Sequence, residues 1–116
     1  MNIALVVLAT LLGVAATVSA MGKLRRMPPV VDTMHAVGVT DQQMKGLAGL
    51  ELLGALGLLV GIWVPVIGVL AALGLSLYFI GALVAHIRAK QQAKDLAPAL
   101  VLTVLSLITL VLELAR

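Results

Sequence analysis

The sequence contains no cysteine and has few aromatic or charged residues. Trp, Tyr and Phe occur once each, and charged residues make up 11% of the 116 positions. Without cysteine there is no disulfide, thiol nucleophile or thiolate metal site. No phosphate-binding loop, nucleophile–base pair or haem or cluster ligand set is evident in the rest of the sequence. We therefore expect a protein that is not an enzyme, with no catalytic, cofactor-binding or metal-binding residues.

The residues that are abundant are apolar. Hydrophobic residues make up 62% of the chain, and the mean hydropathy is +1.19. This composition predicts one all-α, polytopic membrane domain over residues 1–116, with no room for a soluble module. The net charge of +3 does not indicate nucleic-acid binding, because the basic residues lie at the ends of apolar segments, where lipid phosphates and membrane topology account for them.

The first 22 residues carry no charge and end at Lys23. Val18-Ser19-Ala20 resembles a signal-peptidase site, but a signal peptide has basic residues before its apolar run. Met1-Asn2 has none, and the positive charges follow the run instead. The segment is therefore predicted to be a membrane helix over about residues 2–22.

Residues 52–85 form a second uncharged run, of 34 residues, interrupted by Trp63-Val64-Pro65. One membrane helix needs about 20 residues, so this run is too long for one helix and too short for two with a turn. The discrepancy disappears if the helix before Trp63 begins near Asp41. Glu51 then lies within the apolar layer, where an ionisable group is costly and usually faces the protein interior and a partner.

These observations predict a bundle of four transmembrane helices, over about residues 2–22, 41–63, 66–87 and 96–113. Thr40 and Gln43 have the spacing of a capping box, which marks the start of the second helix. Pro65 and Pro98 fall in the first turns of the third and fourth helices. Residues 23–40 form the one long connection, in which we expect a short helix on the membrane interface.

The positive charges are distributed unequally between the two sides of the predicted membrane. Seven of the eight Lys and Arg residues lie in residues 23–45 and 88–94, and the eighth is Arg116. By the positive-inside rule, the loops at 23–40 and 88–95 are predicted to be cytoplasmic and both termini extracytoplasmic. We expect the membrane to be a bacterial-type inner membrane.

Several short motifs occur in a characteristic order along the chain. Lys23 closes the first helix, Leu50-Glu51-Leu52 lies in the second, and His86-Ile87-Arg88 closes the third. Together they resemble the DoxX-like membrane proteins over nearly the whole chain. The resemblance implies a four-helix membrane bundle. Members of that family have been linked to quinone-coupled sulfur oxidation, oxidative-stress complexes and receptor assembly, so the resemblance implies no single reaction.

Four residues could form a polar cluster at the cytoplasmic end of the bundle: Glu51, Lys23, His86 and Arg88. Long basic side chains at helix ends can bend toward a buried carboxylate. Three interpretations remain open for Glu51. It could be a structural ion pair that fixes helix register, or a protonation site or polar anchor for a quinone or lipid headgroup. It could also contact a partner subunit.

Small residues recur at spacings of three and four in the second and third helices. Such residues let membrane helices approach closely, either within one chain or against another protein. The residues of this predicted helix-packing or partner face are Gly54, Gly57, Gly61, Gly68, Ala72, Gly74 and Gly81.

The favoured function is an accessory or assembly subunit, without catalytic activity of its own, that packs against a larger membrane protein complex. The expected partners are the lipid bilayer and either such a complex or a homo-oligomer. One alternative is a quinone- or lipid-binding component of a redox system. The other is a small proton-coupled transporter that uses Glu51, although few aromatic residues are present to bind a cationic substrate.

Overall fold

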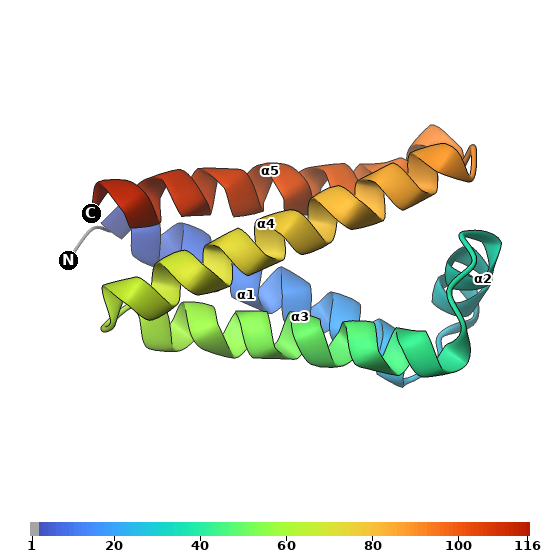
Figure 1. Cartoon of the computed structure of the whole chain (residues 1–116), viewed down its shortest axis with the longest axis horizontal. Helices are drawn as coiled ribbons and strands as arrows, with labels where there is room; N and C mark the ends of the chain where they lie inside the picture. The colour runs from blue at the N-terminus through green and yellow to red at the C-terminus, as the bar shows by residue number, and fades with distance from the viewer. Residues whose placement is uncertain (1–2) are drawn as a thin grey trace.

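The structure is a computed structural model that describes residues 3–116 and consists of five α-helices (Figure 1). Four of them are long and apolar enough to cross a membrane, which confirms the predicted all-α bundle. The helices are α1 (Ile3–Leu24), α2 (Pro28–Ala36), α3 (Asp41–Gly61), α4 (Pro65–Arg88) and α5 (Ala93–Ala115). The short helix α2 occupies the connection between the first two long helices.

The four long helices form a closed ring in which α1 packs on α3, α3 on α4, α4 on α5, and α5 on α1. Consecutive long helices run in opposite directions (Figure 1). Helix α1 therefore begins, α5 ends, and α3 turns into α4 at one end of the bundle, which we call the terminal end. Helix α2 and the turn from α4 to α5 lie at the other end, which we call the loop end.

The centre of the bundle is filled by apolar side chains from three helices. Leu12 of α1, Leu58 of α3, and Leu75 and Phe79 of α4 are all at most 2% exposed. Large apolar residues also cover the outer surface, including Leu53, Leu77 and Val111. A bundle that is apolar on both its inside and its outside fits a lipid environment, because no face needs to meet water.

Local sequence features explain several helix boundaries. The capping box is present before α3: Gln43 N donates to Thr40 Oγ1 at 3.2 Å and Thr40 N donates to Gln43 Oε1 at 3.0 Å. Pro65 is the first residue of α4, where its missing N–H leaves no bond unmade. Gly38, with φ +86°, follows α2, and this backbone conformation suits glycine.

The connection between α2 and α3 is held by charged side chains. Asp41 at the start of α3 pairs with Arg26 at 3.1 Å and with His35 at 2.8 Å. The side chains of Asp41, Arg26 and His35 are each about half exposed, so each ion pair by itself contributes little to stability. Together they keep α2 close to the start of α3.

Candidate functional site

Glu51 and Lys23 form a buried ion pair that joins α3 to α1. The Glu51 side chain is completely buried and that of Lys23 is 8% exposed. Lys23 Nζ also donates to Ser19 Oγ, one turn earlier in α1, at 2.9 Å. The lysine side chain therefore points back along its own helix toward the bundle interior, and not outward to the membrane surface.

Tyr78 connects the same carboxylate to a third helix. Its hydroxyl donates to Glu51 Oε1 at 3.1 Å. Glu51 is ten residues from the start of α3 and Tyr78 is ten residues from the end of α4, so each lies about 15 Å along its helix from the loop end. The carboxylate thus links α1, α3 and α4 in the half of the bundle nearer the loop end.

His86 lies closer to the loop end and is 6% exposed. Among residues 3–116, no hydrogen bond or ion pair joins its ring to Lys23 or Glu51.

Arg88 does not join this cluster, and the prediction that it would is wrong. It is exposed and has no ion pair with any residue in the described part of the chain. Two residues along an α-helix correspond to a rotation of about 200°. Since His86 faces the interior, Arg88 faces outward.

Three buried polar atoms have no hydrogen-bond partner among residues 3–116: Glu51 Oε2, His86 Nδ1 and Glu113 Oε1. Buried polar atoms are nearly always paired, so each of these has unused bonding capacity. Two of the three belong to Glu51 and His86, which are members of the predicted polar cluster.

The sequence analysis did not find a second buried carboxylate, Glu113, at the terminal end. Its side chain is 0% exposed, and Arg116 donates to it at 2.9 Å. The same guanidinium donates to the carbonyl oxygens of Gly61 at 2.7 Å and Ile62 at 2.8 Å. Arg116 therefore binds the free carbonyl end of α3 as well as Glu113, as a cation at a helix C-terminus does.

A sequence pattern could have indicated this carboxylate. Thr103, Ser106, Thr109 and Glu113 follow one another at spacings of three and four residues and are all buried. This spacing places them on one face of α5. A polar face in an otherwise apolar membrane helix is expected to point inward.

The predicted small-residue face divides into an inner and an outer part. A Cβ atom at Gly54 would lie 2.6 Å from Leu75, and one at Gly57 would lie 2.9 Å from Ala71. Gly61 and Gly68 bring α3 and α4 into backbone contact, and a Cβ at Gly68 would also overlap Glu113. Ala72 is fully buried. These five residues therefore pack α3, α4 and α5 against one another.

Gly74 and Gly81 form the outer part of that face. A Cβ atom at either residue would meet nothing within 4 Å, and both residues are exposed. They are consequently free to contact lipid or another molecule.

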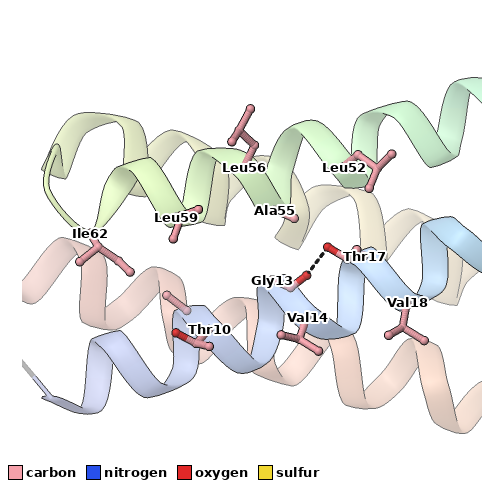
Figure 2. Close-up of a pocket in the computed structure, with 11 residues that line it drawn as sticks. Thr10, Gly13, Val14, Thr17, Val18, Leu52, Ala55, Leu56, Leu59 and Ile62 are labelled. Carbon is pink, nitrogen blue, oxygen red and sulfur yellow. Dashed lines mark hydrogen bonds between the residues drawn. The ribbon is translucent and has the colours of Figure 1, made fainter.

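A groove of about 460 Å³ runs along the outside of the bundle between α1 and α3 (Figure 2). Its small residues include Ala9, Gly13 and Ala55, and its larger residues include Leu56 and Leu59. The hydroxyls in the groove, Thr10 and Thr17, donate to carbonyl oxygens of their own helix at 2.7 and 2.8 Å. The groove therefore presents an essentially apolar surface.

Within residues 3–116, no group of three His, Asp or Glu side chains is arranged to hold a metal ion.

The comparisons with curated proteins and with solved structures gave no match. The sequence model of the DoxX-like family matches residues 7–109, which is most of the chain. This protein therefore belongs to the DoxX-like family.

Proposed function

We propose that this protein is an accessory subunit that binds a transmembrane helix of a larger membrane complex in the groove between α1 and α3. The groove is the observation that supports this function. It is open to the membrane, carries no charged side chain, and is long enough to involve residues from Thr10 to Val18 of α1 (Figure 2).

The residues at the bottom of the groove favour a helix as the occupant. A Cβ atom at Gly13 would have only the Ala55 carbonyl oxygen near it, at 3.9 Å. Small residues of this kind let a neighbouring helix approach closely, which is how membrane helices associate in the absence of a hydrophobic driving force.

The polar groups inside the bundle support the same proposal. Lys23 and Glu51 pair with each other, and so do Arg116 and Glu113. These charges connect the helices of the protein itself. A protein whose buried charges hold its own helices together, and whose outer surface offers an apolar groove, suits packing against a partner better than chemistry.

The test is to fill the groove without disturbing the bundle. Gly13→Leu places a large side chain in the groove, and Gly74→Leu places the same side chain on the outside of α4, where a Cβ meets nothing within 4 Å. Both glycines lie about 15 Å from the terminal end. Native-membrane pull-downs in gentle detergent should lose the partner with Gly13→Leu and keep it with Gly74→Leu.

Folding must be measured separately for both variants. Helix content and thermal stability in detergent should match the wild type. Equal recovery of partner proteins by all three proteins would refute docking in this groove, and so would recovery of a homodimer alone.

The alternative is a ligand or proton site at the loop end, either a quinone or lipid-headgroup site or the transporter site. The unpaired Glu51 Oε2 and His86 Nδ1 atoms favour it. Neither groove described in this structure is lined by Glu51 or His86, so we prefer the accessory function. If Glu51 serves as a proton site, Glu51→Gln should keep its melting temperature and lose a pH-dependent proton flux in vesicles.

We also propose that the loop end faces the cytoplasm of a bacterial-type inner membrane. The support is the excess of Lys and Arg at this end, including Arg25, Arg26, Lys90 and Lys94. Reporter fusions after Arg26 and Lys94 should read cytoplasmic, and a fusion at Arg116 should read extracytoplasmic. A cytoplasmic reading at Arg116 would overturn the orientation.

A further inference from the structure

A second groove, of about 590 Å³, lies at the loop end between α2 and the last turns of α4. One wall consists of Ala36, Val37 and Gly38, at the end of α2. The other wall comes from Gly81, Val84, Ala85, Arg88 and Ala89 of α4 and the residue after it. The groove thus lies between the end of the short helix α2 and the last turns of α4.

Arg88 is the single charged residue that lines this groove. No carboxylate lines it, and within residues 3–116 no acidic side chain forms an ion pair with Arg88. Two of the other three arginines are paired, Arg26 with Asp41 and Arg116 with Glu113, and Arg25 lies outside the groove. The guanidinium of Arg88 is therefore free to bind an anion from outside the protein.

The other residues of the groove are apolar or small. Val84, Ala85 and Val37 offer methyl groups, and a Cβ atom at Gly81 would meet nothing within 4 Å. From Gly81 to Arg88 the groove extends about 10 Å along α4, within the depth of about 15 Å of one leaflet of the hydrocarbon core. The occupant must accordingly have an apolar chain and an anionic head.

We propose that this groove is a binding site for an anionic phospholipid, with the lipid phosphate on Arg88 and one acyl chain against Gly81 and Val84. Arginine suits this role because its planar guanidinium donates two parallel hydrogen bonds to a phosphate. Basic pockets on the positively charged side of membrane proteins hold anionic headgroups in this way. Ala36, Val37 and Gly38 give the groove a second wall, opposite the residues of α4.

The test measures lipid retained by the purified protein in native mass spectrometry. The full-length protein is delipidated and incubated with phosphatidylglycerol, with phosphatidylcholine of the same chain length, or with inorganic phosphate. We expect one phosphatidylglycerol to remain bound, with little phosphatidylcholine and no phosphate. Arg88→Gln should weaken phosphatidylglycerol binding about fivefold, the loss expected for one basic residue near an anionic lipid.

Two further variants separate the headgroup from the acyl chain. Gly81→Leu keeps Arg88 but fills the apolar part of the groove, so it should also reduce phosphatidylglycerol binding. Arg25→Gln removes one exposed charge from the loop end outside the groove and should leave binding unchanged. Circular dichroism and size-exclusion chromatography establish that each variant is folded.

Three outcomes would overturn the proposal. Equal losses with Arg25→Gln and Arg88→Gln would show attraction to net charge and not to a site. Equal retention of phosphatidylcholine and phosphatidylglycerol would show a general lipid belt. Retention of inorganic phosphate at the same level as the lipid would assign Arg88 to a free anion.

Discussion

The bundle buries two carboxylates that have different kinds of partner. Glu51 lies in the half of the bundle nearer the loop end, and we call it the loop-end carboxylate; its partners are Lys23 and Tyr78, which are 28 and 27 residues away in the chain. At the terminal end, Glu113 pairs with Arg116, three residues away at the end of the same chain segment. Glu51 therefore joins three helices directly, whereas Glu113 bonds within its own segment.

The terminal end is held mainly by close backbone packing. Gly61 of α3 and Gly68 of α4 are in backbone contact, and Arg116 binds the carbonyl oxygens at the end of α3. At the loop end, a Cβ atom at Gly46 or Gly81 would meet nothing within 4 Å, and one at Gly22 would lie in ordinary contact with the Val30 side chain, at 3.4 Å. The helices are therefore joined by a buried carboxylate in the half nearer the loop end and by close backbone packing at the terminal end.

The largest expected effect comes from removing the loop-end carboxylate. Glu51→Ala leaves Lys23 buried without its partner, and breaking a buried ion pair costs about 3–5 kcal/mol. Glu113→Ala should cost less, because the Arg116 side chain is 17% exposed and keeps its bonds to Gly61 and Ile62. The measurement is reversible unfolding in mixed micelles with increasing dodecyl sulfate.

Glu51→Gln serves as the matched control for this prediction. It keeps the shape and the hydrogen-bonding atoms but loses the charge, so its stability should lie between those of the wild type and Glu51→Ala. If Glu51→Ala and Glu113→Ala lose the same free energy of unfolding, the proposed difference between the two ends does not exist.

A smaller effect is expected from adding one methyl group at the terminal end. In Gly61→Ala the new Cβ would overlap the backbone of Gly68, and overpacking of this kind costs about 1–3 kcal/mol. Gly74→Ala adds the same methyl group where nothing lies within 4 Å. Since alanine favours the helix by up to about 1 kcal/mol over glycine, Gly74→Ala should stabilise the protein. The unfolding free energies of both variants are measured in the same way. A stabilising effect of Gly61→Ala would contradict the close contact between Gly61 and Gly68.

Much of the fold could be predicted because the thickness of a membrane sets the length and the apolar composition of the helices that cross it. The run of residues 52–85 and the interruption at Trp63–Pro65 required a long helix beginning near Asp41. The structure has that helix, from Asp41 to Gly61. The burial of Glu51 followed from the same length argument, without any knowledge of its partner.

The parts that could not be predicted depend on helix rotation. A helix that is apolar all round does not reveal which face is inside, so the inner glycine Gly57 and the outer glycine Gly81 looked alike in the sequence. Arg88 was expected inside because a long basic side chain at a helix end can bend toward a buried carboxylate, but a rotation of about 200° separates it from the buried His86. The burial of Glu113 follows from the polar spacing along α5, but the contact of its partner Arg116 with the end of α3 depends on packing that the sequence does not show.

The smallest expected effect tests whether the loop-end carboxylate really reaches a third helix. Tyr78→Phe removes the hydroxyl that donates to Glu51 Oε1 at 3.1 Å, and hydrogen bonds between membrane helices contribute about 0.6–2 kcal/mol. Thr10→Val is the control, because the Thr10 hydroxyl bonds only the carbonyl of Val6 in its own helix and should change stability little.

A double-mutant cycle assigns the effect to the contact itself. Introduced into Glu51→Ala, Tyr78→Phe should lose most of its effect, because the acceptor of the hydroxyl is already gone. The unfolding free energies of the wild type, the two single variants and the double variant together give the coupling energy. If Tyr78→Phe costs the same with and without the Glu51 carboxylate, the tyrosine acts through packing alone. The loop-end carboxylate would then join only α1 and α3, and the contrast with the terminal end would be reduced to one helix pair.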